Sequence, residues 1–297
     1  MAVLLIGGDA KSAGYIEDSL VEKNLSVIKT TRRTKRTSDN WVYLNFENVS
    51  DFSLPSKIDS AIIIGGVTDY QTCENDYTYA HFINCVQIPA LIEQFLSSNI
   101  FVCYISTNTV FSNENKMPKE YDPHNPKFNY AKLKSIAEYQ ILSKTLFTGK
   151  GNLLSIFRMT KNIDISTTPF DTWLECLRQG KRIKAFSDLF FAPVLFKDSA
   201  DCISEIIQRR LPGIFHLSGE IDISYSEFAK SLATHANISP NLVDSINSSD
   251  AGVDLVYSHP ITGLDMTLTT SLLGFKPVQL STVHDYLASY VLAKNSF

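Results

Sequence analysis

Short apolar runs alternate with longer amphipathic stretches through the first half of the chain. The runs are rich in β-branched residues and have the length of buried strands, which we predict over 2–7, 25–31, 41–46, 60–66, 100–107 and 152–159. Helices are predicted between them, one ending near 23, one over about 75–98 and one beginning near 130. Apolar strands separated by helices are typical of a parallel sheet covered on both faces. We therefore expect a doubly wound α/β fold.

The pattern changes after residue 160. The stretch KNIDISTTPF at 161–170 is polar and irregular, so we predict a loop there. Helices are expected over about 171–180, 198–209, 225–236 and 281–293, with short strands between them, one of them at 213–219. We divide the chain into a sheet domain at 1–160 and a smaller α+β lobe at 161–297, and allow some late segments to return to the main sheet.

Composition and charge narrow the class of protein. The chain has 297 residues, of which 44% are hydrophobic and 20% charged, as in a soluble protein with a sizeable core. Its net charge of −4 gives no overall basic field for nucleic acid or for an anionic membrane. The five cysteines are widely spaced and form no CxxC motif, which favours buried thiols in a reducing compartment. Without a signal-peptide pattern or an apolar run of membrane-spanning length, we expect a cytoplasmic protein that binds neither nucleic acid nor membrane.

Glycines follow the first predicted strand, where an open parallel sheet binds its ligands. Gly7, Gly8 and Gly14 lie between this strand and the next helix. Glycine there permits a tight turn and a close approach of the backbone to a pyrophosphate at the helix N-terminus. In the spacing G-x-x-G-x-x-G the middle position is Lys11, which could reach a phosphate or point to solvent. The stretch is a candidate dinucleotide-binding loop, although glycines that serve only as turn formers give the same pattern.

The end of the second strand bears on the choice of dinucleotide. The adenosine ribose lies there in such a sheet, and an acidic side chain would select a free 2′-hydroxyl. Here the strand ends in TTRRTKR, so Arg32 and Arg33 are candidates for binding a 2′-phosphate, with Arg32 preferred. This favours NADP over NAD, with NAD still allowed, against the alternative of a solvated basic loop.

A threonine, a tyrosine and a lysine form the candidate catalytic set. Thr107 ends the fifth predicted strand, and Tyr130 and Lys134 lie four residues apart on one face of a predicted helix. A lysine ammonium beside a phenol would lower the pKa of the tyrosine toward working pH. Tyr130 could then protonate a carbonyl oxygen that the Thr107 hydroxyl also contacts, and Lys134 could hold the ribose of a nicotinamide. The spacing alone is weak evidence, because tyrosine–lysine pairs also occur by chance.

Longer motifs, in order along nearly the whole chain, resemble those of one family. YISTNTVF at 104–111 is similar to a strand end written STDYVF, and NYAKLKSIAE at 129–138 to a helix written YGxxKxxGE. Further matching segments span 65–84, 186–203, 213–229 and 259–277. The chain thus resembles the extended short-chain dehydrogenase/reductase family, and within it the dTDP-4-dehydrorhamnose reductase branch.

The resemblance implies a Rossmann-type dinucleotide-binding domain and a lobe that binds a nucleotide-sugar. It implies hydride transfer from a reduced nicotinamide, with NADP expected, to a keto-deoxysugar linked to a nucleoside diphosphate. Thr107, Tyr130 and Lys134 match the catalytic trio of the family.

The resemblance also extends to residues around the cofactor. Asn84 matches an asparagine that supports the active-site strand, and we count it among the cofactor-binding candidates. Gly65 and Gly66, at the end of the fourth predicted strand, belong to the same set. The expected partner is a small nucleotide-sugar substrate, and a homodimer is allowed.

Departures from the family pattern leave other activities open. Lys11 replaces the middle glycine, Asn108 and Thr109 replace a D-Y pair, and DLFFAPV at 188–194 lacks the glutamine, glycine and threonine of a DQxGxPT loop. The leading hypothesis is NADPH-dependent reduction of a 4-keto-deoxysugar. The alternatives are a catalytically silent dinucleotide-binding regulatory subunit and a nucleotide-sugar epimerase or dehydratase. A dehydratase usually has an acidic couple after the threonine, and Asn108 and Thr109 are not acidic.

Three further polar residues are candidates for a role near the site. His124, in the loop before Tyr130, is expected to be a solvent-exposed turn residue. Arg158, at the end of the sixth predicted strand, could meet a diphosphate or a carboxylate, and His216 is expected to be structural. The six histidines share no metal-ligand spacing, so we predict no metal site.

Overall fold

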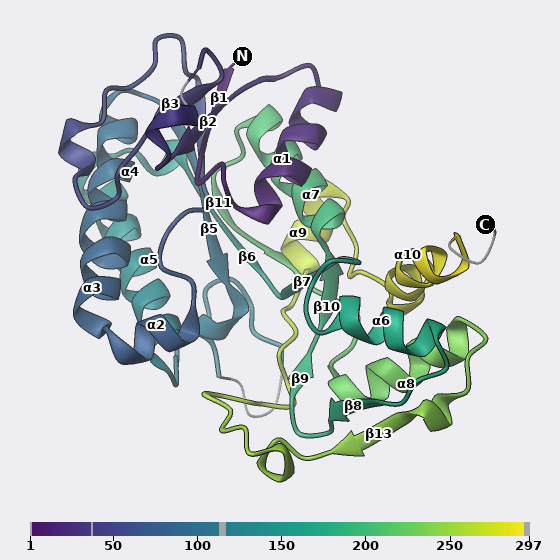
Figure 1. Ribbon diagram of the computed structural model, residues 1–297. Coiled ribbons are helices and arrows are strands. Elements are labelled where there is room, and N and C mark those ends of the chain that lie inside the picture. Colours follow the sequence, from purple (N-terminus) through teal and green to yellow (C-terminus); the bar gives the residue numbers. More distant parts are fainter. Residues whose placement is uncertain (1, 37, 113–116, 294–297) are drawn as a thin grey trace.

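A seven-stranded parallel sheet forms the centre of the molecule (Figure 1). The structure is a computed structural model that describes residues 2–36, 38–112 and 117–293. The strands lie in the order β11-β6-β5-β4-β1-β2-β3, and every neighbouring pair is parallel. They are β1 Ala2–Ile6, β2 Ser26–Thr31, β3 Trp41–Tyr43, β4 Ser60–Ile63, β5 Phe101–Thr107, β6 Leu154–Met159 and β11 Gly213–Leu217. With β1 inside the sheet and the chain winding outward on both sides of it, this is the predicted doubly wound α/β fold.

Helices cover both faces of the sheet, as its apolar strands require. Figure 1 shows one group of helices on each face of the sheet. The first group is α2 Tyr70–Asn75, α3 Tyr77–His81, α4 Ile88–Ser97 and α5 Asn129–Thr148, and the second is α1 Lys11–Glu22, α7 Phe196–Arg209 and α9 Thr267–Leu273. Alternate side chains of β1 point to opposite faces of the sheet. Val3 and Leu5 pack into one apolar cluster, and Leu4 and Ile6 pack into the other.

The long helix predicted over 75–98 is a broken series of shorter helices. It begins earlier, at Tyr70, and is interrupted at Asp76, whose backbone leaves the helical region. The carboxylates of Asp69 and Asp76 each accept the backbone N–H of the residue three positions on, so each starts a new helix. Residues Phe82–Gln87 then form a π-helical turn before α4. Local capping by aspartate therefore overrides the apolar periodicity on which the prediction rested.

A smaller lobe, built largely from residues after 160, packs beside the sheet (Figure 1). Its strands pair as β7 with β10, β8 with β13 and β9 with β12. They are β7 Lys161–Ile163, β8 Ile183–Phe186, β9 Phe190–Phe191, β10 Pro193–Leu195, β12 Ile223–Ser224 and β13 Val243–Ile246. The helices of this lobe are α6 Phe170–Arg178, α8 Tyr225–His235 and α10 Leu280–Ala293. Its core is aromatic, with the ring of Phe170 5.4 Å from Phe228 and 5.6 Å from Trp173.

Two segments of the second half lie where the local pattern did not place them. The predicted loop at 161–170 contains β7, because this stretch pairs with β10, more than thirty residues further on. The strand predicted at 213–219 is β11, which leaves the smaller lobe and pairs with β6 at the edge of the main sheet. In the part of the chain that the structure describes, no helix is both long and apolar enough to cross a membrane.

Candidate active site

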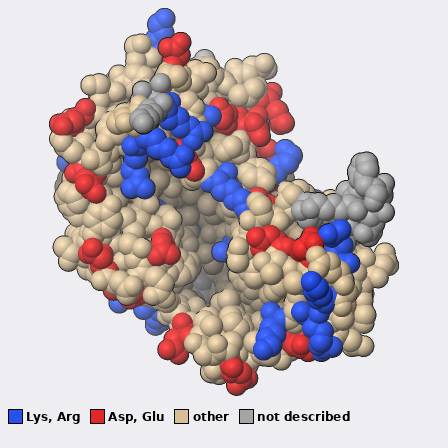
Figure 2. Space-filling view, viewed as in Figure 1, with Lys and Arg blue, Asp and Glu red and all other residues tan. Residues whose placement is uncertain are grey.

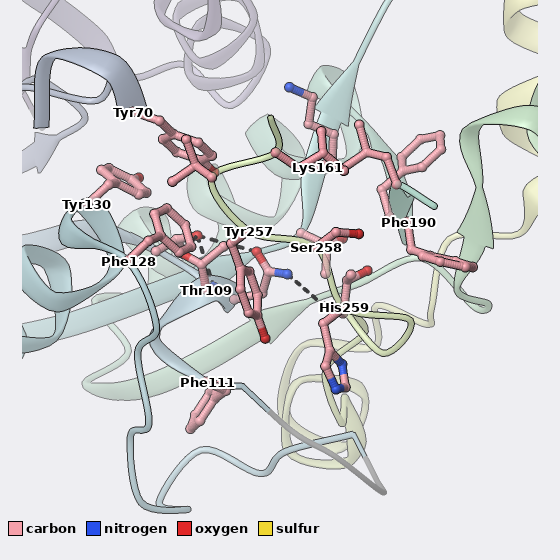
Figure 3. A pocket seen from close by; sticks show the side chains of 18 of the residues that line it. Tyr70, Thr109, Phe111, Phe128, Tyr130, Lys161, Phe190, Tyr257, Ser258 and His259 are labelled. Carbon is pink, nitrogen blue, oxygen red and sulfur yellow. Dashed lines mark hydrogen bonds between the residues drawn. The ribbon is translucent and has the colours of Figure 1, made fainter. Parts of the chain in front are cut away.

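A pocket of about 570 Å³ lies where the carboxyl ends of β5 and β6 meet the smaller lobe. Figure 2 shows the molecule hollowed between its two lobes, and Figure 3 shows the pocket from close by. The lining side chains come from both lobes and include Tyr70, Thr107, Phe111, Phe128, Tyr130, Lys161, Phe190, Tyr225, Tyr257 and His259. Ligands of open parallel sheets bind beyond the carboxyl ends of the strands, so the position suits a binding site.

Thr107 and Tyr130 meet at the wall of this pocket. Thr107 is the last residue of β5, and Tyr130 is the second residue of α5. Burial raises the pKa of Tyr130 above its ordinary value, and Tyr70 and Cys73 act in the same direction, whereas a hydrogen bond with Thr107 acts against them. The phenol of Tyr130 is therefore protonated at neutral pH, while the hydroxyl of Thr107 lies 3.1 Å from that of Thr109 and 3.3 Å from the amide oxygen of Asn108.

Lys134 lies one helical turn beyond Tyr130, but its ammonium is directed to β5. Its Nζ donates to the hydroxyl of Tyr104 at 2.8 Å and to the carbonyl oxygen of Ile105 at 2.6 Å. Burial lowers the pKa of Lys134 to about 8. The expectation that Lys134 lowers the pKa of Tyr130 is wrong for this arrangement, because burial moves that pKa upward and the ammonium is bonded elsewhere.

Aromatic rings surround the hydroxyl of Tyr130. The ring centroids of Tyr70 and Phe128 lie 5.0 and 6.2 Å from that of Tyr130, and Tyr257 stacks on Phe128 at 5.5 Å. Figure 3 shows these four rings gathered on one side of the pocket. Sequence reasoning missed Tyr70, Phe128 and Tyr257 as site residues, since they come from three separate segments that only the fold brings together.

The smaller lobe contributes a cation to the pocket. Lys161, in β7, is the one lysine or arginine among the lining residues that the structure describes. Burial lowers its pKa, although part of the side chain remains exposed. No hydrogen bond or ion pair is recorded for its ammonium within the described residues. Lys161 lay in the predicted loop, and no sequence signal singled it out.

The segment at 254–263 closes another side of the pocket. Its backbone is tied to both lobes, because Asn108 donates to the carbonyl oxygen of Thr262 at 2.8 Å and Asp222 accepts the backbone N–H groups of Thr262 and Gly263. The altered stretch at 188–194 also reaches the pocket, through Leu189, Phe190 and Phe191. The departures at Asn108, Thr109 and 189–191 thus fall on pocket walls, whereas Lys11 lies outside the lining residues.

The glycine-rich turn after β1 packs closely against the neighbouring strands. Gly7 has a positive φ of 96°, and a Cβ there would lie 2.7 Å from the backbone nitrogen of Gly65. A Cβ at Gly8 would lie equally close to a side-chain carbon of β2, whereas one at Gly14 would meet no atom within 4 Å. Ala10 gives α1 no side-chain cap, so the first N–H groups of this helix are available to an anion.

Lys11 points across this turn to the segment after β7. Its Nζ donates to Asp164 at 2.7 Å, and the hydroxyl of Tyr15 donates to the second oxygen of Asp164 at 2.9 Å. Burial would raise the pKa of this carboxyl, but the hydrogen bonds from Lys11, Thr167 and Tyr15 outweigh it and hold the pKa at about 2. Lys11 therefore links α1 to the smaller lobe by an ion pair.

Basic side chains gather near the end of β2, above the hollow in Figure 2. Arg36 donates to Asp9 at 2.8 Å and lies over the ring of Trp41, 3.9 Å from its centroid. Arg33 approaches the same carboxylate at 4.0 Å. Arg32 is exposed, and the described residues include no recorded partner for its side chain. Sequence reasoning missed Arg36, Asp9 and Trp41.

Gly65 and Gly66 follow β4 at the same edge of the sheet as the glycine-rich turn. Asn84, in the π-helical turn, accepts the N–H of Val67 at 3.0 Å and donates to its carbonyl oxygen at 2.8 Å. A Cβ at Gly66 would lie 2.8 Å from this asparagine side chain. Asn84 thus holds the backbone after β4 beside the glycine-rich turn. No group of three metal-ligating side chains occurs within the described ranges.

Comparison with known proteins places the chain in a family. A family model described as the RmlD substrate binding domain matches residues 1–270. The chain belongs to this family. The RmlD-like assignment confirms the resemblance to the extended short-chain dehydrogenase/reductase family that the motifs indicated. A search of curated protein sequences found no match.

Solved structures share the fold of this RmlD-like chain along its whole length. A dTDP-4-dehydrorhamnose reductase from Clostridium acetobutylicum is 20% identical, covers 97% of this chain and 98% of its own, and has a TM-score of 0.77. The Bacillus anthracis reductase in complex with NADP is 17% identical over 97% and 99% of the two chains, with a TM-score of 0.78. A UDP-N-acetylglucosamine 4-epimerase from Bacillus cereus is 15% identical over 98% and 99%, with a TM-score of 0.78. At these identities the likeness establishes the fold.

Proposed function

We propose that the protein is an NADPH-dependent reductase of a 4-keto-deoxysugar linked to a nucleoside diphosphate. The observation that carries this proposal is that Thr107 and Tyr130 both line the wall of one pocket, which also contains Lys161. Membership of the RmlD-like family supports it, as does the NADP bound to the Bacillus anthracis relative.

The pocket supplies a proton and a hydrogen bond to one oxygen. Bound NADPH would provide the hydride for the carbonyl carbon. Tyr130 donates its phenolic proton to the carbonyl oxygen, and its raised pKa keeps that proton available at neutral pH. Thr107, which lines the same pocket, contacts the same oxygen through its hydroxyl and stabilises the negative charge that develops there.

The residues around the glycine-rich turn fit NADP. The turn at Gly7 and Gly8 and the uncapped N-terminus of α1 would hold the pyrophosphate. Arg32 and Arg33 would bind the 2′-phosphate. Lys134 has three N–H groups and uses two of them on β5, which leaves one for a ribose hydroxyl of the nicotinamide half.

The substrate pocket suits a charged sugar nucleotide. Aromatic rings such as Tyr70 and Tyr257 offer flat apolar surfaces to a base or to a sugar face. Lys161 offers an ammonium for a diphosphate. Among the described residues, this ammonium makes no hydrogen bond or ion pair. Reduction of a carbonyl, rather than dehydration, follows from the amide and hydroxyl of Asn108 and Thr109, which cannot act as an acidic couple.

The test is loss of NADPH absorbance with a panel of nucleotide 4-keto-sugars. Tyr130→Phe should lower kcat by at least about a hundredfold, because the proton donor is removed. The matched control is Tyr121→Phe, at a tyrosine that is 79% exposed, which should react like wild type. Turnover by Tyr130→Phe near the wild-type rate would contradict the role of Tyr130. NADPH binding without turnover of any panel member would instead indicate a silent dinucleotide-binding subunit.

A further inference from the structure

A buried arginine behind the pocket has a partner for every one of its N–H groups. Arg158, in β6, is 1% exposed, and its Nε and Nη2 donate to the carboxylate of Glu138 on α5 at 2.5–3.2 Å. Its Nη1 donates to the carbonyl oxygen of Glu120 at 2.7 Å and lies 3.3 Å from Nε2 of His216. Its Nη2 lies 2.8 Å from Nε2 of His124. These contacts use all five guanidinium donors.

The two histidines must accept from this arginine, since a guanidinium has no lone pair to offer. Both imidazoles are therefore neutral and carry their proton on Nδ1. Nδ1–H of His124 donates to Ser135 at 2.9 Å, and Nδ1–H of His216 donates to the carbonyl oxygen of Asp265 at 3.0 Å. Burial lowers the pKa of His124 and lowers that of His216 to about 3. The expectation that His124 is a solvent-exposed turn residue is wrong, because its side chain is 4% exposed.

Glu138 continues the helix face that carries the proposed catalytic residues. Tyr130, Lys134 and Glu138 follow one another at intervals of four along α5. The carboxylate of Glu138 is fully buried and also accepts the hydroxyl of Ser106, the residue before Thr107. The ion pair of Arg158 and Glu138 is thus joined to β5, the strand that ends in Thr107, and it lies on α5, the helix that contains Tyr130.

Glu138, which pairs with Arg158, lies one helical turn beyond Lys134 on the same face of α5. The other titratable groups that face the Lys134 ammonium are Tyr104 on β5 and Cys85 in the π-helical turn. Burial raises the pKa of Tyr104 well above its ordinary value and that of Cys85 to about 12, so both are neutral. Of these three groups, only Glu138 is a carboxylate. Among the described residues, it is therefore the anion that balances the buried ammonium of Lys134.

We propose that Arg158 and Glu138 are positioning residues for the reaction: Glu138 stabilises the charged ammonium of Lys134, and Arg158 fixes that carboxylate against the helix. This inference deepens the proposed function and rests on it for its kinetic consequence. A purely structural ion pair would affect folding and leave the protonation of Lys134 unchanged. The titration of Lys134 therefore separates the two roles.

The variants remove the charge of Glu138 with and without its partner. Glu138→Gln leaves Arg158 buried without an anion, which can prevent folding. The double variant E138Q/R158M removes both charges and avoids this. Ser135→Ala is the matched control, because it breaks a bond of the same network and keeps the carboxylate. Circular dichroism and thermal melting identify the variants that fold.

The decisive measurement is the pH titration of Lys134, by NMR of the full chain labelled with ¹³C at lysine Cε. It requires neither substrate nor turnover. We expect the midpoint to fall by about one pH unit in each folded variant that lacks the carboxylate, and to stay unchanged in Ser135→Ala. An unchanged midpoint in E138Q/R158M would overturn the proposal. If neither variant folds, the wild-type midpoint still decides, since a value well below 8 would mean that the carboxylate does not stabilise the ammonium.

The pH profile of kcat/KM supplies the kinetic readout. The alkaline limb of E138Q/R158M should move to lower pH by the same amount as the NMR midpoint, since Lys134 loses its proton earlier. Absence of turnover by the wild-type protein on every nucleotide sugar would refute the proposed function. The NMR titration of Lys134 would then be the test of the role of Arg158 and Glu138. An active variant whose alkaline limb is unmoved would refute the positioning pair alone.

Discussion

Lys161 gives the pocket its positive charge. It lines the pocket from β7, and the described residues include no recorded partner for its ammonium. A diphosphate placed there would gain a charge-assisted contact in a partly desolvated setting.

Lys161→Met should therefore weaken the binding of a nucleoside diphosphate about tenfold, with little effect on the corresponding nucleoside. Titration calorimetry with both ligands measures the difference. Lys181→Met, at an exposed lysine outside the lining residues, is the control. Equal losses for the nucleoside and the diphosphate would show that Lys161 contributes packing and not charge recognition.

Arg32 is the exposed guanidinium next to the proposed ribose site. Arg33 and Arg36 both lie near Asp9, so Arg32 is the arginine whose charge is least balanced by a recorded neighbour. Arg32→Ala should raise the Kd for NADPH about tenfold and leave the Kd for NADH nearly unchanged. Fluorescence titration with the two dinucleotides checks this. An equal change for both would exclude a contact with the 2′-phosphate.

Single site residues could be predicted from the sequence where they lie at the end of one strand or at the start of one helix. Thr107 and Tyr130 lie at such positions, and the fold brings them together. The ring of Tyr70 was not predicted, although it lies in the matching segment 65–84, because nothing in that segment places the ring in the pocket. The ammonium of Lys161 was not predictable, because it reaches the pocket from a segment with no motif of its own. His124 was misjudged since its partner, Arg158, lies 34 residues further along the chain.

At the level of elements, the strands of the main sheet could be predicted because most of them, such as β1, β4, β5 and β6, are buried on both faces and so read as apolar runs. The helix over 75–98 could not, since Asp69 and Asp76 cap new helices within it. β7 is too short to show a period, and its pairing with β10 depends on the tertiary fold.

The ion pair between Lys11 and Asp164 joins α1 to the segment after β7. Asp164 is 4% exposed and accepts several hydrogen bonds, so Asp164→Asn should lower the free energy of unfolding at pH 7 by about 1–3 kcal/mol. Urea unfolding measures this, with Asp171→Asn, which bonds only to its neighbour Thr172, as the control.

The pH dependence of this difference follows from the lowered pKa of Asp164. The contribution is present above the unfolded pKa of about 4 and is lost as the pH falls through the folded pKa of about 2. Wild type and Asp164→Asn should therefore converge in stability between pH 4 and pH 2. A constant difference over that range would contradict the role of the carboxylate charge.

For the molecule as a whole, three buried histidines should make stability depend on pH. Burial lowers the pKa of His124, of His216 to about 3 and of His284 to about 4. The folded state thus holds fewer protons than the unfolded state below about pH 6.5, so stability is full above that pH and falls with acidification. The raised pKa values of Glu120 and Asp198 oppose this trend.

We expect the free energy of unfolding to fall between pH 7 and pH 5 by roughly 1 kcal/mol per pH unit for each of His216 and His284. His124 acts in the same direction, and the carboxyl contribution opposes all three. Urea unfolding at a series of pH values measures this slope. His284→Asn should give a shallower slope than wild type. A stability that rises on acidification over this range would mean that these imidazoles are charged in the folded protein.

The order of the strands also bears on how the chain is made. β6 is complete once residue 159 has been synthesised, but its outer neighbour, β11, is contributed by residues 213–217. A nascent chain emerging from the ribosome therefore displays one unpaired sheet border while the intervening stretch of the smaller lobe is translated. Such borders recruit other strands and promote aggregation. A fragment cut at residue 160 would keep that border permanently, so the two lobes are distinct in shape but must be synthesised and folded together.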